Sequence, residues 1–398
     1  MLKVKANNDP AGELSYNPKD REYIFNYMHN NPISLTMPYQ QKSYLSHYNL
    51  HPIFDMSMPE GYLFSLLKNL LIKEYGEIND FLLFEHLSQS IEGYLTYQKE
   101  DAQHNKTIEF KLQEILEDRD ENLFSRLVEH FLNQSAIAGV QPKVLARLQD
   151  KAMLSTKEYI VKSFSDEYPH LAENEFFCMK VLSYAKIKVP NFWLSKSKKL
   201  FVMEKFTYQK GTDSFYGFEE FCVLFGYTKE QKYKGSYEQI TKAINKISTN
   251  KKEDLKEFYK ITVMNYLLKN GDAHLKNFGV LYTADKKSRF LAPAYDVVNT
   301  VIYLPRDKPA LMLNGKKVWW DRDALVNFGI EYALLTPKEA QKEFDNCIEA
   351  VKIIDKEIAQ YIKDNPSFQK FGEKFRSILH FSIEQNINQT YKDIYGVL

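Results

Sequence analysis

The spacing of apolar residues divides the chain into helix-like and strand-like stretches. In residues 62–75 and 254–270 apolar side chains recur every three or four positions, as Leu255, Phe258 and Ile261 do, which predicts amphipathic helices. Further helices are expected at 121–133 and 171–184. Short apolar or alternating runs bounded by turn residues predict strands at 33–37, 144–148, 159–164, 192–195 and 200–205.

The order of these elements predicts a chain of three parts. Residues 1–105 are expected to form an α+β module that ends near the polar stretch KEDAQHNKT. Residues 106–205 are expected to be rich in strands, and residues 206–398 to be mainly helical. A hairpin, with strands at 278–282 and 290–292, interrupts the helical part. The predicted fold class is therefore α+β.

Composition narrows the class of protein. The 398 residues include 53 Lys and Arg against 52 Asp and Glu, so the formal charge of +1 gives no support to binding of a polyanion by bulk charge. The three cysteines, Cys178, Cys222 and Cys347, are too scattered for a disulfide scaffold or a Cys-rich zinc site. The sequence shows neither an export signal nor an apolar run of membrane-spanning length, and we expect a cytoplasmic protein without a membrane anchor.

The segment from Asn270 to Asn277, NGDAHLKN, holds the densest cluster of chemically useful side chains. An Asp and an Asn five positions apart, between a helix and a hairpin, can place Asp272 at an acceptor hydroxyl and Asn277 at a metal ion. The returning hairpin then brings Asp296 as a second Mg²⁺ ligand, since Mg²⁺ takes one or two carboxylates together with phosphate oxygens. The competing interpretation makes Asn270 and its neighbours a helix cap and a turn.

Residues upstream point to a nucleoside triphosphate. The loop SAIAGVQPK, residues 135–143, has small residues that allow backbone N–H groups to approach phosphate. Taken alone, the loop is better explained as a tight structural turn, because it is neither a Walker A sequence nor Gly-x-Gly-x-x-Gly. Lys162 on the next strand and Glu175 on the next helix match the Lys–Glu pair that holds ATP phosphates in kinases, against the alternative of two surface charges. The run FVMEKF, residues 201–206, is a candidate hinge whose backbone contacts adenine.

The sequence contains other residues that are candidates for catalysis. His274 and Lys276 share the loop with Asp272 and are taken as further candidate catalytic residues, although a structural role for His274 is equally consistent with its position. His-Glu-x-x-His and Gly-x-Ser-x-Gly are absent, so zinc hydrolysis and a serine-hydrolase nucleophile have no support. The 27 Tyr and 27 Phe are spread along the chain and indicate core and half-buried surface rather than a base-stacking platform.

The motifs IAGVQPK, YIVK, ENEFFCMKV, MEKF, NGDAHLKNFGV and PAYDVV occur in an order that resembles the HipA family of bacterial toxin kinases. The phrases AGELSY, ISLTMP and PIFDMSMPEG resemble the additional N-terminal subdomain of that family. The resemblance implies a two-lobed, protein-kinase-like fold, with a small β-rich N-lobe over 106–205, a large helical C-lobe over 206–398 and the N-terminal subdomain over 1–105.

The resemblance also implies roles for individual residues. Asp272 resembles the catalytic base, Asn277 and Asp296 the Mg²⁺ ligands and Lys162 the ATP lysine, with Glu175 as its ion-pair partner. The phosphate loop corresponds to Ala138, Gly139, Val140, Gln141 and Lys143, and the adenine hinge to Glu204, Lys205 and Phe206. Family members carry serines for inhibitory autophosphorylation where this chain has Ala136 and Ala138; Ser135 is the candidate substitute. Thr207 stands where a ribose-binding acid is expected.

The function implied is an ATP- and Mg²⁺-dependent protein Ser/Thr kinase that acts as the toxin of a toxin–antitoxin module. Expected partners are a HipB-like helix-turn-helix antitoxin, operator DNA through that antitoxin, and a protein substrate, with aminoacyl-tRNA synthetases as the family's known targets. Two alternatives stay open. One is a small-molecule kinase of the aminoglycoside or choline type, which Asn270 in place of a leading His argues against. The other is a catalytically idle corepressor that only binds the antitoxin.

Overall fold

The computed structural model describes residues 1–58, 68, 71–72, 76, 78–88, 91–99, 111–117, 152–155, 158–163 and 167–387. The chain forms two compact units. The first unit comprises Met1–Ala172, Asn191–Lys232 and Leu281–Lys287. The second comprises Glu173–Pro190, Tyr233–Val280 and Ser288–Leu398.

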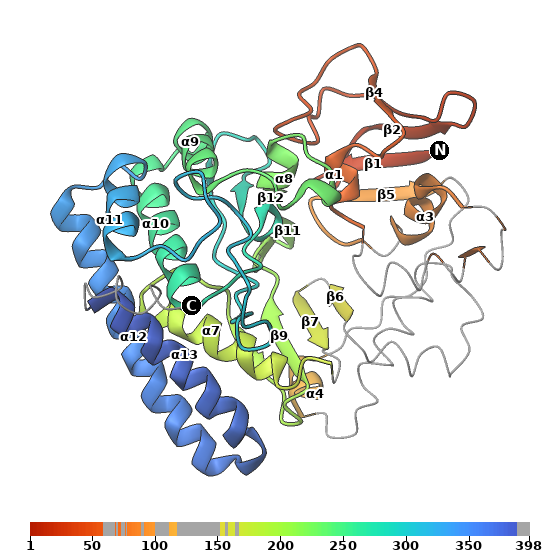
Figure 1. Ribbon diagram of the computed structural model, residues 1–398. Helices are drawn as coiled ribbons and strands as arrows, with labels where there is room; N and C mark the ends of the chain where they lie inside the picture. The colour runs from red at the N-terminus through yellow and green to blue at the C-terminus, as the bar shows by residue number, and fades with distance from the viewer. Residues whose placement is uncertain are drawn as a thin grey trace. The chain divides into compact units, whose positions relative to one another are not determined.

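The first unit begins with a five-stranded antiparallel sheet in the order β4-β3-β2-β1-β5. Leu2, Val4 and Ala6 alternate onto its buried face, as expected of a strand with one side in the core. Helix α3 packs beside β5, where the rings of Phe84 and Tyr97 meet edge to face at 4.9 Å (Figure 1). The elements are β1 (Leu2–Ala6), β2 (Asp9–Asn17), β3 (Glu22–Tyr27), β4 (Tyr44–His47), α1 (Pro52–Asp55), α3 (Asp80–Leu87) and β5 (Leu95–Lys99).

A second antiparallel sheet in the same unit carries Lys162. Its order is β6-β7-β9-β8, and Val161 pairs with Val202 while Lys162 pairs with Phe201. Val161 and Val202 are fully buried and belong to the same hydrophobic core as the first sheet. The elements are α4 (Leu112–Glu117), β6 (Ala152–Ser155), β7 (Tyr159–Ser163), β8 (Phe192–Leu194) and β9 (Leu200–Glu204). The strands expected near 159–164, 192–195 and 200–205 are thereby confirmed.

Two local expectations were wrong. Residues 33–37 form no strand: Ile33 and Met37 are buried in the core, and the Leu35 N–H donates to the Glu219 carboxylate at 2.6 Å instead of to a neighbouring strand. The helical region does not begin directly after residue 206. Short strands and turns precede it, namely β10 (Tyr208–Gln209), β11 (Ser214–Phe215), β12 (Gly217–Glu220), α8 (Phe221–Leu224) and the 3₁₀ turn η2 (Lys229–Gln231).

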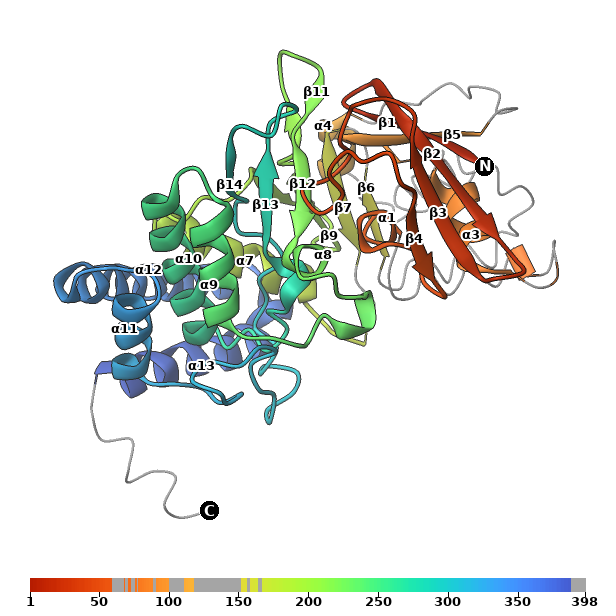
Figure 2. The same ribbon diagram turned by 90° about the horizontal axis from the view of Figure 1, so that it is seen from above.

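The second unit is mainly helical. The expected helix at 171–184 is confirmed as α7 (Leu171–Tyr184), and that at 254–270 as α10, which begins and ends about one turn earlier. The long helices α12 and α13 pack against each other (Figure 1). The remaining elements are α9 (Tyr237–Ile247), α10 (Lys251–Leu267), η3 (Leu275–Asn277), β14 (Arg289–Leu291), α11 (Arg322–Glu331), α12 (Pro337–Asp364), η4 (Pro366–Phe368) and α13 (Gln369–Ile387). The residues of β13 (Gly279–Tyr282) are divided between the two units. Figure 2 shows α9 and α10 side by side.

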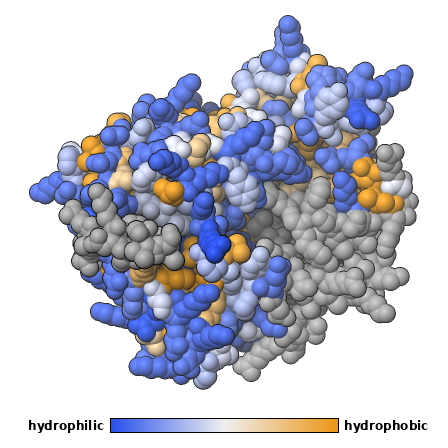
Figure 3. Space-filling view, in the orientation of Figure 1, coloured by the Kyte–Doolittle hydropathy of each residue, from blue (hydrophilic) through white to orange (hydrophobic). Residues whose placement is uncertain are grey.

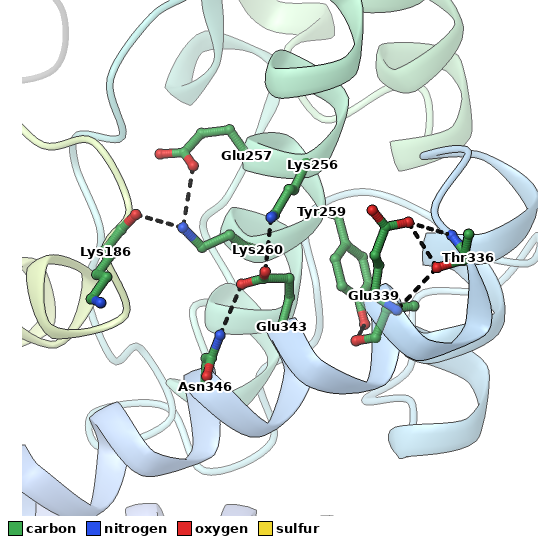
Figure 4. Close-up of polar contacts among 10 residues, drawn as sticks. Lys186, Lys256, Glu257, Tyr259, Lys260, Thr336, Glu339, Glu343 and Asn346 are labelled. Atoms are coloured by element: carbon green, nitrogen blue, oxygen red, sulfur yellow. Dashed lines mark hydrogen bonds and ion pairs between the residues drawn. The ribbon is translucent and has the colours of Figure 1, made fainter.

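Helix α10, whose C-terminal end leads into the NGDAHLKN segment, is held by contacts on two sides. Lys256 Nζ lies 2.9 Å from Glu343 Oε1 of α12, and the Tyr259 hydroxyl donates to the Ala340 carbonyl at 3.0 Å (Figure 4). On the other side Lys260 donates to the Lys186 carbonyl at 2.5 Å (Figure 4). These contacts join α10 to α12 and to the turn after α7, so the helix provides a fixed base for the loop that follows it.

The face in Figure 3 is largely hydrophilic, with hydrophobic side chains in separate groups. Among the described residues, none of the helices combines the length and the apolar character needed to cross a bilayer.

Candidate active site

The end of α10 sets the direction of the candidate catalytic loop. Lys269 takes the left-handed conformation with φ of 53°, and the Asn270 N–H donates back to the Asn265 carbonyl at 2.8 Å. The left-handed position of the helix end is thus a lysine, although glycine is the usual residue there. Burial lowers the pKa of Lys269 to about 8, and its Nζ lies 5.1 Å from the ring centroid of Trp319. The chain leaves the helix with a well-defined turn.

Asn270 and Gly271 fasten the loop to its surroundings. The Asn270 amide donates to Asn265 Oδ1 at 2.9 Å, and Asn270 Oδ1 accepts from the Asp272 N–H at 3.2 Å. The Gly271 N–H donates to Thr300 Oγ1 at 2.8 Å. A side chain at 271 would meet Asp307 and Thr300, since a Cβ built there lies 2.0 Å from Asp307 Oδ2. Glycine is therefore required by close approach rather than by its backbone angles.

Asp272 is the exposed carboxylate of the loop. Its Oδ1 accepts a hydrogen bond of 2.9 Å from the hydroxyl of Tyr233, a residue that the sequence analysis did not select. The ring of Tyr233 also meets His274 edge to face, with 5.2 Å between centroids. An exposed carboxylate that accepts from a hydroxyl has the arrangement required of a group that orients an acceptor alcohol.

His274 and Lys276 play different parts in the loop. His274 is buried, and its backbone N–H donates to Asn277 Oδ1 at 2.9 Å, which ties the start of η3 to its end. Lys276 is half-buried, and its carbonyl accepts from the Tyr295 hydroxyl at 2.7 Å. The contacts of both residues hold the backbone of the loop in place.

Asn277 and Asp296 lie together, as the sequence analysis expects of two metal ligands. Asn277 Nδ2 donates to Asp296 Oδ2 at 2.6 Å, although 19 residues separate them along the chain. Asp296 has a left-handed backbone with φ of 59°, which bends the chain after the hairpin and is costly for a non-glycine residue. With Asn265, Asn270 and other residues around α10, this pair lines a small recess in the second unit.

The donor set fits Mg²⁺ bound together with a polyphosphate. No group of three or more His, Cys, Asp and Glu side chains gathers among the described residues, so a site that holds a metal by protein ligands alone is not seen there. Mg²⁺ needs fewer protein ligands, because it keeps waters and binds substrate phosphates. The Asp296 carboxylate would supply one ligand. Asn277 Oδ1 would supply another, since a carbonyl oxygen has two lone pairs and His274 uses one.

The segment after Asp296 is attached to α7 by a pair of buried amides. Asn174 Nδ2 donates to the Asn299 carbonyl, and the Asn299 N–H donates to Asn174 Oδ1, both at 2.9 Å. Both residues are fully buried. Asn174 precedes Glu175, the expected partner of Lys162. The helix that carries Glu175 therefore also holds the chain that carries Asp296.

The candidate ATP lysine lies in the first unit. Lys162 on β7 is 8% exposed, which contradicts the alternative of a solvated strand lysine, and its Nζ lies 5.9 Å from the ring centroid of Phe201. Glu175 on α7 is likewise buried at 1% exposure and is no surface glutamate. The two residues belong to different units, and their ion pair stays a prediction.

The candidate hinge is engaged within the first unit. The N–H groups of Glu204 and Lys205 donate to the carbonyls of Asn191 and Glu158 at 2.8 Å and 2.7 Å, so neither serves as a donor to a base. The Glu204 carboxylate lies 2.5 Å from Lys210 Nζ. Burial lowers the pKa of Lys205 to about 8. The predicted contact with adenine is therefore limited to the other backbone groups of the hinge. Those of Phe206 come next along the chain.

The phosphate loop lies outside the described residues. This applies to the candidate positions Ala138, Gly139, Val140, Gln141 and Lys143, and to Ser135, so their roles stay predictions. The strand expected at 144–148 and the helix expected at 121–133 fall in the same part of the chain.

Two residues of the site were missed from the sequence. Tyr233 lies 39 residues before Asp272, and Asn299 lies 125 residues after Asn174. Neither belongs to a short motif, and no pattern in a single sequence links such distant positions. The residues Asp296, Val297 and Val298, which precede Asn299, belong to a motif that points to this segment of the chain. The motif does not predict the contact of Asn299 with Asn174.

Comparison with known proteins gives a consistent result. A family model described as HipA-like C-terminal domain matches residues 135–354, and one described as HipA N-terminal domain matches residues 2–98. A putative kinase of Haemophilus influenzae is 30% identical over 186 residues, which cover 42% of this chain and 53% of that protein. The putative kinase Y4dM of Sinorhizobium fredii is 27% identical over 286 residues, covering 66% and 65%. The chain thus spans about half to two thirds of these relatives.

A solved structure matches the whole chain. The HipA toxin described from Shewanella oneidensis MR-1, in a complex with HipB and operator DNA, superposes with a TM-score of 0.71 over 97% of both chains, at 16% sequence identity. Such a low identity supports a statement about the fold only. Together with the strands and helices above, the match confirms the predicted α+β, two-lobed, kinase-like fold class with an additional N-terminal subdomain.

Proposed function

Because the chain belongs to the HipA family, whose two domain models match 2–98 and 135–354, we propose that it is an ATP-dependent protein Ser/Thr kinase. The observation that supports this most directly is the contact of 2.6 Å between Asn277 and Asp296, five residues and 24 residues after the exposed Asp272. This arrangement provides a place for an acceptor hydroxyl beside a place for Mg²⁺.

In the proposed reaction each group has one task. Asp272 accepts the hydrogen bond of the acceptor hydroxyl and aims its oxygen at the γ-phosphorus of ATP. The new O–P bond forms as the bond to the β–γ bridging oxygen breaks, the proton leaves through Asp272, and ADP departs. Asn277 and Asp296 would hold Mg²⁺, which would supply positive charge beside the phosphates. Lys162 would contact the α- and β-phosphates, and the loop at 138–143 would place its N–H groups on them.

The proposed role is that of a toxin whose partner is an antitoxin. The relative from Shewanella oneidensis is described in a complex with HipB and operator DNA, and we propose a HipB-like antitoxin for this chain, with DNA contacted through it. The proposed acceptor is a Ser or Thr of a cellular protein, with an aminoacyl-tRNA synthetase as the candidate drawn from the family resemblance. Phosphorylation of such a protein would stop translation and arrest growth.

The test is phosphate transfer by matched variants. Purified protein is incubated with MgATP labelled in the γ-phosphate and a cell lysate, and labelled proteins are identified by mass spectrometry. We expect Asp272→Asn to reduce transfer by about 100-fold or more, as loss of a group that positions and accepts a proton does. Asp323→Asn, which changes an exposed aspartate in the first turn of α11, is the control and should transfer normally.

Each alternative predicts a different result. Label in a soluble metabolite rather than in protein would indicate a small-molecule kinase. Transfer that is equal in wild type and Asp272→Asn would refute the proposal and leave a binding role. The side chain of the buried Asn270 donates to Asn265 of α10 and accepts from the Asp272 N–H, which supports a structural role for this position and speaks against the small-molecule kinase.

A further inference from the structure

Tyr233 occupies the place that the proposed reaction assigns to the acceptor. Its hydroxyl donates to Asp272 Oδ1 at 2.9 Å, the same contact that a Ser or Thr hydroxyl must make to be oriented by this carboxylate. Two hydroxyl groups cannot take the same position on one carboxylate oxygen. An acceptor that approaches Asp272 from this side therefore has to displace Tyr233.

The contact is built from more than one interaction. The Tyr233 ring packs edge to face on His274 of the same loop, with 5.2 Å between centroids, so the phenol is aimed at Asp272 by the loop itself. The Tyr233 carbonyl accepts from Lys317 Nζ at 3.0 Å. A hydrogen bond to a charged carboxylate is among the stronger ones in proteins, which favours the closed arrangement.

The same segment has the features of a part that can move. Tyr233 is 45% exposed, so its displacement opens no hole in the core. Gly235 follows two residues later with φ of 95°, a backbone conformation that few residues except glycine adopt, just before α9 begins. The Lys317 contact lies at the exposed surface. Backbone bonds to Met312 hold Gly235 and Tyr237, so the part expected to move is the side chain of Tyr233, whose contact with Asp272 lies at the surface.

We infer that Tyr233 is a built-in competitor of the protein acceptor: its hydroxyl fills the acceptor position on Asp272, and phosphate transfer requires it to swing away. This inference rests on the proposed role of Asp272. It assigns the acceptor position to the space that the Tyr233 hydroxyl takes, open to solvent on the side of the 233–236 segment. An acceptor residue that enters there must come from an exposed, extended stretch of its protein.

The competition has a measurable consequence. If the position is open in only a fraction of molecules, the apparent affinity for the acceptor falls by that fraction. Removing the hydroxyl while keeping the ring opens the position without disturbing the packing on His274. We therefore expect Tyr233→Phe to lower the KM for an acceptor peptide, or to raise basal ATP hydrolysis with water as the acceptor, by about fivefold to tenfold.

The core of the experiment compares wild type, Tyr233→Phe, Asp272→Asn and the double variant. MgATP turnover is measured with water alone and with an arrayed library of serine and threonine peptides. Tyr233→Ala, which removes the ring as well, is a second test and should be at least as active as Tyr233→Phe. Tyr48→Phe, at a position that directly follows β4 and is 71% exposed, is the control and should behave as wild type.

The possible results separate the two claims. Faster turnover in Tyr233→Phe that disappears in the double variant supports the inference. Turnover that is unchanged or slower, with Asp272→Asn inactive, overturns it and leaves the proposed function intact, because a tyrosine that only positions Asp272 helps the reaction. Turnover that does not depend on Asp272 in any background overturns both. Phosphate found on Tyr233 itself also overturns it, since the residue would then be an acceptor.

Discussion

The hydrogen bonds between Asn174 and Asn299 offer the sharpest test of how the candidate metal-binding segment is held. Asn174→Ala removes the hydrogen-bond partners of the Asn299 N–H and the Asn299 carbonyl, both of which are bonded at 2.9 Å. Asn299 is fully buried. A buried polar group that is left without a partner costs about 1–3 kcal/mol. Two such groups predict a loss of about 2–6 kcal/mol in the free energy of unfolding, unless water enters the space.

The assay is urea denaturation of wild type, Asn174→Ala and a control. Asn245→Ala is the control because it changes an exposed asparagine within helix α9 and corrects for the better helix propensity of alanine. Since Asn299 lies three residues after Asp296, the same variant should also need more Mg²⁺ for half-maximal phosphate transfer. If Asn174→Ala lost less than about 1 kcal/mol relative to the control, the two bonds would not anchor this segment, because the loss would fall below that of one buried group.

Two further predictions concern the loop and the helix behind it. Gly271→Ala places a methyl group 2.0 Å from Asp307 Oδ2 and should slow phosphate transfer by about tenfold or more, whereas Gly93→Ala, which has no atom within 4 Å of the added Cβ, should not change it. In α12, burial raises the pKa of Glu343, but hydrogen bonds from Lys256 and Asn346 outweigh this and leave the pKa below its ordinary value of 4.5. The stabilisation of the fold by the ionised Glu343 carboxylate is therefore complete above pH 4.5 and is lost as the pH falls through the lowered pKa. We expect urea denaturation at pH 6 to give a free energy of unfolding for Glu343→Gln that is about 0.5–1 kcal/mol below that of wild type. The difference should shrink towards pH 3, and a difference independent of pH would contradict this reasoning.

Local pattern was enough to predict the elements that carry the site. Helix α7 begins and ends where the apolar spacing predicts, and β7 and β9 differ from prediction by one residue at their ends. In these segments the apolar positions of the sequence pattern are the positions that face the core, as for Val161 and Val202. Local sequence and tertiary packing therefore favour the same secondary structure.

The segment at 33–37 was mispredicted because its partner is distant in sequence. Its apolar residues suit a strand, and Ile33 and Met37 are indeed buried. Its hydrogen bonds, however, go to Glu219, which lies 184 residues beyond Leu35. Glu219 is itself fully buried, and its burial raises the pKa of the carboxyl. A buried acid that satisfies backbone groups across the fold leaves no periodic signal in either segment.

The candidate site shows the same division. Asp272, Asn277 and Asp296 were found because they sit in two short motifs at a spacing that suits one chemistry. Their contacts, and the residues that hold them, depend on which distant segments meet, so Tyr233 and Asn299 became visible only in the structure.

The contrast between these two residues bears on how the site works. The two contacts between Asn174 and Asn299 join backbone groups to a fully buried side chain, and such bonds are broken only at the cost of a buried unpaired group. The Gly271 N–H is also bound, by the half-buried Thr300 hydroxyl. The contact at Asp272 is between two exposed side chains, and water replaces either partner when they separate. Motion in this part of the site should therefore be confined to Tyr233, while the ligands Asn277 and Asp296 keep their places. A structure with MgATP in which Asp296 had moved and Tyr233 had not would contradict this division.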